Sequence, residues 1–436
     1  MNWRLKKIMS LVNIISAIGN NNSVYPLLVR DCGVENPIKI ALTYKQNIDE
    51  SPKVARYAVR ERTIDEYTTS AVWLGAIPVV EAASDMFISK KGYNPKISAR
   101  LFKEDAVKNP VQGIEFNIKK FANSTSKEVQ AAVADLIKVR DNKKAFESLV
   151  SKKFTAAVAI PMALIGFIIP KCIFALSRKI AEKEKQNQPD YSDILGMSDI
   201  TTFGQKKDVS FTGFASTVAT LTTPDKMAAI DGGYAVGRVL TARKGYEPFD
   251  IAFKMAGMLY LNYVAPKQIE KLFNFTSARI FKSNVNLDPK LLNNKEFISD
   301  VENNRFDFLG RMNGAQMLEY IDNNPQSPFT KYASMFKKVT MLTQDSRDPR
   351  IFVDIKDLEN FGKDIFSFSK DALNSKNLTK FAKKALRVKS GNIISNVALS
   401  SFLLSYVLPK TQFALRELFT GSKLEPGLIN IDNKKR

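Results

Sequence analysis

Residues 154–176 read FTAAVAIPMALIGFIIPKCIFAL, and this stretch decides how the chain can fold. No charged residue occurs between positions 154 and 170. A run of about 18 apolar residues is the usual threshold for a transmembrane helix, because about 20 residues at helical rise cross the hydrocarbon core. Pro161 and Pro170 interrupt the run, and a proline removes a backbone donor and kinks a helix. The stretch therefore predicts a bent apolar helix at a membrane.

Basic side chains lie on both sides of this stretch. Lys152 and Lys153 precede it, and Lys171, Arg178 and Lys179 lie at its far end. A helix that crosses a bilayer once is normally oriented by an excess of Lys and Arg on one flank. Basic residues on both flanks favour instead a bent segment that enters and leaves the same anionic leaflet.

The chain as a whole is also basic. Its 436 residues include 65 Lys and Arg against 44 Asp and Glu, a net charge of +21. Hydrophobic residues at 44% and charged residues at 25% are ordinary for a folded protein, which argues against disorder and against a transporter that is apolar throughout. The positive charge indicates an anionic partner, and phosphate is the group that lipid head groups and nucleic acids share.

The residue types argue against most catalytic chemistry. The sequence has no histidine, which removes the commonest general base, the commonest transition-metal ligand and the imidazole of hydrolase triads. Cys32 and Cys172 form no CxxC pattern, and no P-loop occurs. We therefore assign no catalytic, cofactor-binding or metal-binding residue and expect no enzyme. An enzyme that uses Lys, Asp or Glu stays open as a class.

Residues 1–22 have the charge pattern of a signal peptide, since basic residues precede an apolar run at positions 8–18. Within the run, Ser10, Asn13 and Ser16 recur at a spacing of three. This spacing predicts an amphipathic helix whose opposite, apolar side lies in a lipid interface. The alternative is a terminal helix that packs on a protein core.

The expected fold is mainly α, with several hydrophobic helices that prolines kink and with minor short strands. Most of the chain has the apolar spacing of helices. Two stretches, residues 38–44 and 114–118, alternate apolar and other residues with a period of two, which predicts short strands.

Polar stretches divide the chain into regions. After the N-terminal segment we expect a helical region at residues 23–188, which contains apolar segments at 67–88 and 154–176. A polar linker at 189–223 follows, since this part is rich in Gly, Ser and Thr. A second helical region spans residues 224–436 and contains apolar segments at 249–273 and 392–419.

Three apolar segments end on the same dipeptide. Pro-Lys occurs at positions 170–171, 266–267 and 409–410, each time after apolar residues. The recurrence has two possible origins, a duplicated module or chance. In both cases Lys267, Lys271 and Lys410 join the basic residues of the first stretch as candidate ligands of lipid phosphate.

These patterns predict a membrane-associated protein of structural or interaction type at a bacterial inner membrane. Its apolar, proline-containing helices would enter lipid, and the flanking Lys and Arg would bind anionic head groups at about 1 kcal/mol each. No cofactor is expected.

Two alternatives use the same residues differently. The apolar segments could be central helices of a soluble protein, hydrophobic all round because they are buried all round. Such a basic helical protein could bind nucleic acid through the basic and aromatic stretches at 329–338 and 370–389.

Overall fold

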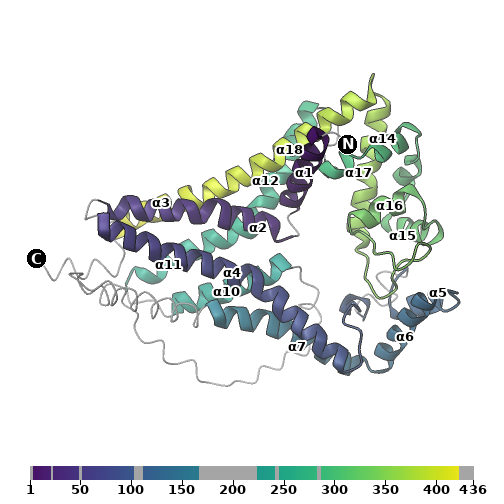
Figure 1. The fold of residues 1–436 in the computed structure, drawn as a ribbon, viewed down its shortest axis with the longest axis horizontal. Coiled ribbons are helices and arrows are strands. Elements are labelled where there is room, and N and C mark those ends of the chain that lie inside the picture. The colour runs from purple at the N-terminus through teal and green to yellow at the C-terminus, as the bar shows by residue number, and fades with distance from the viewer. Residues whose placement is uncertain are drawn as a thin grey trace, which may run out of the picture.

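The computed structural model describes residues 3–20, 23–48, 52–102, 111–165, 223–240, 245–281 and 286–421. These residues form helices, and within them no β-strand occurs, only an isolated antiparallel bridge between Met341 and Arg347. The prediction of a mainly α fold is confirmed. Figure 1 shows two parts, a wing of long helices on the left and a lobe of short helices on the right.

The wing contains most of the apolar sequence. Its helices come from both halves of the chain, and they pack against one another along their length. They are α1 (Trp3–Gly19), α2 (Tyr25–Arg30), α3 (Asn36–Asn47), α4 (Pro52–Lys90), α7 (Lys143–Ala163), α10 (Thr223–Leu240), α11 (Glu247–Leu259), α12 (Ala265–Phe281), α18 (Leu378–Phe402) and α19 (Leu408–Thr420).

Three π-helical segments join wing helices end to end. They are η1 (Asp31–Glu35) between α2 and α3, η5 (Tyr260–Val264) between α11 and α12, and η7 (Leu403–Val407) between α18 and α19. Each begins six residues before a proline, at Pro37, Pro266 and Pro409 respectively. The prolines therefore do not end these helices, which continue through a local widening.

The position of the prolines explains the π-helical geometry. A proline has no N–H, and its ring clashes with the carbonyl four residues before it. In η5 the amide of Ala265 bonds to the carbonyl of Tyr260, five residues back, so the helix widens just before Pro266. The carbonyls of Leu261 and Asn262 thereby lose their usual helical donors.

The predicted segments fall on this architecture in different ways. The apolar segment at 67–88 lies within α4, 249–273 covers α11, η5 and part of α12, and 392–419 covers parts of α18 and α19 with η7 between them. Of the segment at 154–176, the structure describes residues up to 165, where Leu164 and Ile165 are π-helical, as in the segments before the other prolines. The linker prediction at 189–223 lies outside the described residues except for Thr223.

Both predicted strands are wrong. Residues 38–44 belong to α3, which Pro37 opens and which packs on α4. Residues 114–118 belong to α5 (Ile114–Phe121), which buries Ile114, Asn117 and Phe121 at helical spacing. The buried position at Asn117 is polar, so the sequence hid the period of the helix.

The lobe has a large apolar core in its C-terminal part and two smaller apolar clusters around η2 (Ala99–Phe102), α5 and α6 (Lys127–Asp141). Its aromatic side chains pack against one another; Phe297, for example, lies 5.3 Å from Tyr332 and 5.9 Å from Phe368 between ring centroids. The lobe consists of η2, α5, α6, α13 (Pro289–Leu292), α14 (Lys295–Glu302), η6 (Asp307–Arg311), α15 (Gly314–Asn323), α16 (Pro328–Met335) and α17 (Ile355–Leu373).

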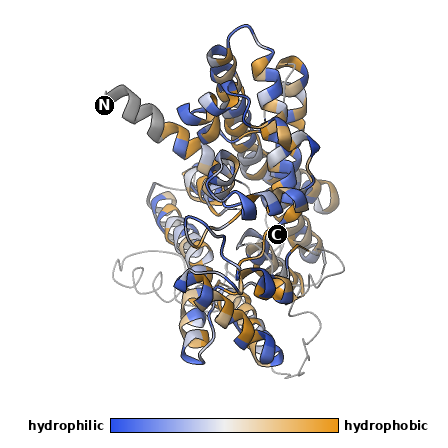
Figure 2. Ribbon diagram, turned by 90° about the vertical axis from the view of Figure 1, so that its right-hand side faces the viewer, coloured by the Kyte–Doolittle hydropathy of each residue, from blue (hydrophilic) through white to orange (hydrophobic). Residues whose placement is uncertain are grey.

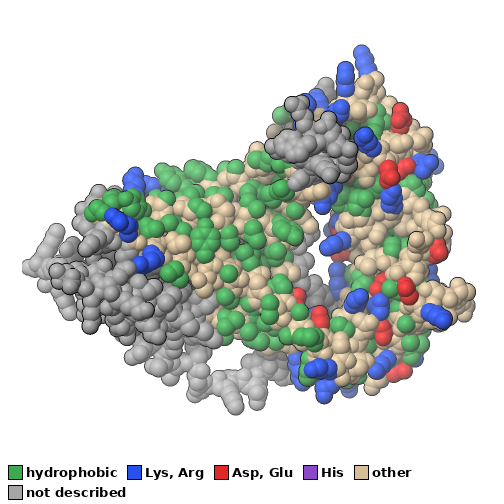
Figure 3. All heavy atoms as spheres, in the orientation of Figure 1, with side chains coloured by type: hydrophobic (Ala, Val, Ile, Leu, Met, Phe, Trp, Pro, Cys, Tyr) green, Lys and Arg blue, Asp and Glu red, His purple; other side chains and the backbone are tan. Residues whose placement is uncertain are grey.

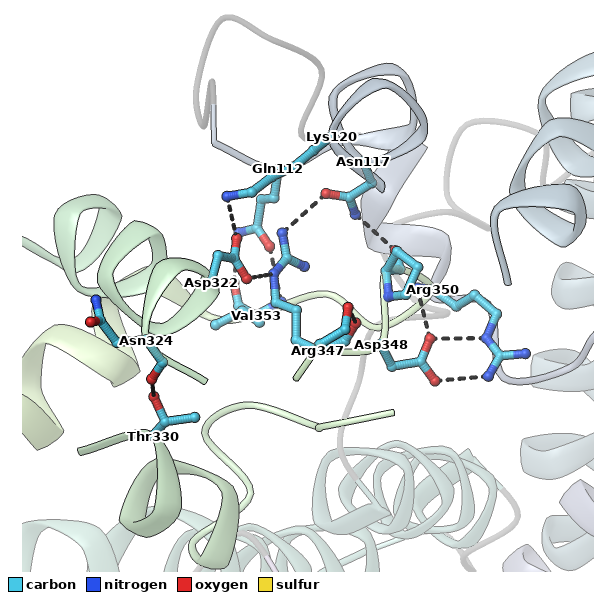
Figure 4. A network of polar contacts seen from close by, with 12 residues as sticks. Gln112, Asn117, Lys120, Asp322, Asn324, Thr330, Arg347, Asp348, Arg350 and Val353 are labelled. Carbon is cyan, nitrogen blue, oxygen red and sulfur yellow. Dashed lines mark hydrogen bonds and ion pairs between the residues drawn. The ribbon is translucent and has the colours of Figure 1, made fainter. Parts of the chain in front are cut away.

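A buried polar network joins the two sequence segments of the lobe (Figure 4). The fully buried Arg347 side chain donates to Asp322 at 2.7 Å and to Asn117 of α5 at 3.2 Å. Arg350 makes two hydrogen bonds of 2.9 Å to Asp348. The bond from Arg347 to Asn117, and one of 3.0 Å from Arg350 to Asp135 of α6, connect residues more than 200 positions apart and so fix α5 and α6 on the rest of the lobe.

The N-terminal helix α1 packs on protein. Val12 and Ile15 are buried against neighbouring helices, while Asn13 is exposed. Ser16 is also buried, and its hydroxyl donates to Asp288 at 2.8 Å. The prediction that Ser16 lies on an exposed polar face is therefore wrong. Its hydroxyl can be buried because Asp288, just before α13, accepts its hydrogen bond.

Candidate functional site

The outer surface of the wing is unusually apolar. On α4, Val79 is 68% exposed and Met86 64% exposed, and on α12 Ile280 is 79% exposed. Figure 3 shows hydrophobic side chains over much of this face of the wing, whereas charged side chains gather on the lobe. In Figure 2, where the lobe faces the viewer, hydrophilic and hydrophobic residues alternate along its helices, as expected for helices with one buried side.

Two helical stretches of the described residues are long and apolar enough to cross a membrane, by length and composition only. They are residues Arg62–Lys90 and Leu378–Thr420, and 17% and 39% of their most apolar windows are buried. A central helix of a soluble protein would be buried over most of its surface. The apolar character of these stretches therefore does not come from burial on all sides.

The interior of the wing contains a cluster of polar and charged side chains, which we call the polar centre. Lys39 forms ion pairs with Glu35 at 2.6 Å and with Glu66 at 3.2 Å, and Arg62 pairs with Glu66 at 2.6 Å. The polar centre consists of Arg30, Asp31, Glu35, Asn36, Lys39, Arg62, Glu66, Ser70, Asp231 and Tyr263. The fully buried Asn36 donates to Ser70 at 2.9 Å. Helices α2, α3, α4 and α10 and the segments η1 and η5 contribute these residues.

Arg30 connects the polar centre to the backbone of η5. Its guanidinium is 3% exposed and donates to the carbonyls of Leu261 and Asn262 at 3.3 and 3.2 Å, and to Pro26 at 3.2 Å. The first two are the carbonyls that the π-helical geometry before Pro266 leaves without helical donors. A similar contact occurs at η1, where the Tyr67 hydroxyl donates to the carbonyl of Cys32 at 3.3 Å.

Other buried polar contacts hold the remaining wing helices together. Arg416 of α19 binds both carboxylate oxygens of Asp250 of α11, at 3.2 and 2.6 Å, and Gln412 donates to the same carboxylate at 2.9 Å. Asn396 of α18 donates to the carbonyl of Pro266 at 3.0 Å. The wing thus buries several polar groups beside an apolar cluster of Leu27, Trp73, Ile77, Ile165, Met227 and Ile230, while many large apolar side chains lie on its outside.

The predicted lipid-binding residues lie apart from the polar centre. Lys152, Lys267, Lys271 and Lys410 are exposed on the wing helices. Lys153 is half-buried and forms an ion pair with Asp85. The remaining three predicted residues, Lys171, Arg178 and Lys179, lie outside the described residues. The structure does not gather the described lysines into one pocket, and their role in lipid binding stays a prediction.

The basic and aromatic stretch at 329–338 is part of the lobe and its core. Phe329 is buried, and Phe336 packs on Phe361 with 5.8 Å between ring centroids. Lys331 and Lys338 form ion pairs with acidic side chains of the lobe. These aromatic rings therefore contribute to the packing of the lobe, and nucleic-acid binding by this stretch stays a prediction.

Comparison with known proteins finds no matching family model, no matching curated protein and no matching solved structure.

Proposed function

We propose that this is a membrane-associated protein of structural or interaction type, with the wing embedded in a lipid bilayer and the lobe in the water beside it. The distribution of polarity carries the proposal. In hydrocarbon, polar side chains turn towards the interior of a helix bundle and apolar side chains towards lipid. The polar centre and the exposed apolar side chains of the wing fit this arrangement, whereas the lobe is built on buried aromatic and aliphatic side chains.

The exposed apolar side chains of the wing would supply the free energy of membrane binding. Transfer of a large apolar side chain from water into an apolar phase contributes roughly 1.5 to 3 kcal/mol. Val79, Met86 and Ile280 are each more than 60% exposed, and Phe87, Leu272 and Phe275 of the same two helices are at least 50% exposed. Contiguous exposed apolar surface of this kind is typical of membrane or protein contacts.

The lysines supply the electrostatic part of the proposal. Lys152, Lys267, Lys271 and Lys410 are exposed next to apolar segments, so their ammonium groups can reach lipid phosphates. Each would contribute about 1 kcal/mol near an anionic surface. The basic charge of the chain suits the anionic leaflet of a bacterial inner membrane.

Flotation with lipid vesicles tests the proposal. We expect the protein to float with vesicles of phosphatidylcholine alone, and more completely when phosphatidylglycerol is added, with the added part lost in high salt. The variant Val79→Lys/Met86→Lys places two charges in the apolar phase at about 2.5 to 3.5 kcal/mol each, so it should lose flotation.

The matched control carries two lysines in the lobe, Ile137→Lys/Met335→Lys, at positions that are also exposed. It should float like the unchanged protein. Recovery of the unchanged protein at the bottom of the gradient would contradict the proposal. Equal binding to neutral and acidic vesicles would contradict its electrostatic part alone.

A further inference from the structure

Two carboxylates of the polar centre have no cationic partner among the described side chains. Asp231 of α10 accepts a hydrogen bond of 2.6 Å from the Tyr263 hydroxyl, and Asp31 of η1 lies beside Ser70 and the Cys32 thiol. The acidic groups Glu35 and Glu66, by contrast, are paired with basic residues. A buried carboxylate without a counter-ion is costly unless a proton or cation neutralises it.

Arg30 does not neutralise either carboxylate. Its hydrogen bonds go to the carbonyls of Pro26, Leu261 and Asn262. In the described part of the chain it forms no salt bridge. The surplus negative charge of the polar centre therefore rests on Asp31 and Asp231.

Two nearly completely buried polar atoms next to these carboxylates also lack partners within the described residues. Asn36 is 0% exposed and has no donor to its Oδ1; Trp73 is 8% exposed, and its Nε1 lies beside the Asp231 carboxylate without a well-formed hydrogen bond. Asn36 and Asp31 both lie beside Ser70, and Trp73 lies beside Asp231. An unpaired buried polar atom is a cost that a protein retains for a reason.

The unpaired atoms differ in what they need. Asn36 Oδ1 needs a donor, and Ser70 links Asn36 to Asp31, whose protonated form would carry an O–H. Trp73 Nε1–H needs an acceptor. An ionised Asp231 would supply one, in addition to the carboxylate oxygen that already accepts from the Tyr263 hydroxyl. The surroundings thus suit a neutral carboxyl at one position and a charged carboxylate at the other.

Little free space adjoins this cluster. A cavity of about 20 Å³ lies beside Arg30, lined also by Asn262 and Tyr263. This volume holds about one water molecule. An organic solute does not fit here, whereas a proton and one water molecule do.

We propose that the polar centre is a proton-binding site, in which Asp31 and Asp231 gain and lose a proton taken from water. Each uptake converts one carboxylate and one proton into one neutral carboxyl, with no other reactant. The inference rests on the proposed membrane location, since a low-dielectric surrounding on the outside of the wing keeps the cluster away from bulk water.

The other charged groups near the two carboxylates come from several elements. Glu35, Lys39 and Glu66 act electrostatically on Asp31, and Asp31 and Glu35 act on Asp231. The neighbouring side chains of α7, Val158 and Met162, are apolar. The remaining charged residues of α10 and α11 with described side chains are Asp225, Lys226, Asp250 and Lys254, of which Lys226 pairs with Glu81 and Asp250 with Arg416. η7, which contacts η1 and η5, has no charged residue.

The fluorescence of Trp73 can report the proton. The sequence has two tryptophans, so Trp3→Phe leaves Trp73 as the single indole, beside Asp231. We expect its emission, measured in vesicles from about pH 4.5 to 9.5, to change in a one-proton step, since this range brackets a carboxyl that burial perturbs by up to about 3 to 5 units. Asp231→Asn should abolish the step, and Asp31→Asn should shift it.

Tyr263→Phe is a milder variant that keeps the shape of the side chain. Removing the hydroxyl removes a donor to the charged form of Asp231, so the step should move to higher pH by about 1 to 2 units. The matched control is Asp85→Asn on α4, which removes a carboxylate that Lys153 already pairs and should leave the step unchanged.

The outcomes separate the two proposals. A protein that floats with vesicles but shows flat Trp73 emission overturns the proton site and leaves the membrane proposal standing. A step that persists unchanged in both Asp31→Asn and Asp231→Asn also overturns it. Failure to float contradicts the membrane proposal, whatever the fluorescence shows.

Discussion

Asp354 shows how a single residue can combine two roles. Its carboxylate caps α17 by accepting from the amide of Asp357 at 3.0 Å, and it also accepts from Arg100 of η2 at 3.2 Å. Burial alone would raise the pKa of this carboxyl. The hydrogen bonds from the Asp357 amide and the Arg100 guanidinium outweigh burial and leave the pKa below its usual value.

This lowered pKa predicts how acid affects the lobe. A carboxyl whose pKa is lower in the folded than in the unfolded state adds stability above the unfolded value of about 3.9, and this stability is lost as pH falls through the folded value. We expect Asp354→Asn to remove that loss, because Asn is also a good N-cap and only the charge disappears.

The measurement is the free energy of urea unfolding as a function of pH. Near neutral pH the variant should be less stable than the unchanged protein, and the difference should shrink below about pH 4. Asp345→Asn, at an exposed turn of the lobe, serves as control. A difference that stays constant with pH would show that the charge of Asp354 contributes nothing.

Among single residues, the sequence drew attention to lysines beside apolar runs, whose lipid binding stays a prediction, but not to the polar centre. The basic residues were recognisable because they flank apolar runs, and Lys152, Lys267, Lys271 and Lys410 are exposed. Asp31 and Asp231 lie 200 positions apart and meet only in the folded chain. The spacings of Glu35 with Lys39 and of Arg62 with Glu66 were the local signals, since residues four apart share a helix face.

The π-helical segments are the most informative elements of the wing. The sequence predicted bent helices at Pro266 and Pro409, and the structure has a π-helical segment before each. The sequence did not predict which donor binds the carbonyls of Leu261 and Asn262, which lack their helical donors. That use depends on Arg30, which comes from the opposite half of the chain and reaches η5 only after the helices pack.

The link between Pro266 and Arg30 can be tested by a double-mutant cycle. Pro266→Ala restores an N–H that can bond to the carbonyl of Asn262, so this carbonyl no longer depends on Arg30. We expect Arg30→Met alone to cost about 3 kcal/mol of wing stability, because it leaves buried carbonyls unpaired. In the Pro266→Ala background the same change should cost about 1 kcal/mol less.

The free energies would be measured by unfolding in detergent. Pro248→Ala, near the start of α11, is the control, because the missing N–H of a proline in the first turn of a helix has no intrahelical acceptor. It should not change the cost of Arg30→Met. If the effects of Arg30→Met and Pro266→Ala on the free energy of unfolding are additive, the Arg30 guanidinium does not compensate for the missing N–H of Pro266.

On the scale of the whole molecule, the wing and the lobe are stabilised by different means. The lobe has an aromatic core and a buried network around Arg347, as a soluble domain does. The wing has polar contacts inside and apolar side chains outside. Composition averaged over the chain concealed this difference, since 44% hydrophobic residues suits an ordinary soluble protein.

This division predicts that lobe mutations leave membrane binding unchanged. Arg347→Met leaves Asp322, whose side chain is 2% exposed, paired with Lys120 alone, so the unfolding of the lobe should become easier by about 1.5 to 3 kcal/mol. Flotation should be the same as for the unchanged protein. Arg305→Met removes an exposed ion pair with Asp300 and should cost at most about 1 kcal/mol. Loss of flotation in Arg347→Met would mean that the two parts fold as one unit.

The wide turns before the prolines also affect any labelling study of this protein. A π-helical turn holds roughly one residue more than an α-helical turn, so the helical wheel of α12 is offset by roughly 100° from that of α11. A spin label or cysteine chosen by continuing the wheel of α11 through Tyr260–Val264 would point in the wrong direction. Positions on α12 and α19 have to be counted afresh from Ala265 and Leu408.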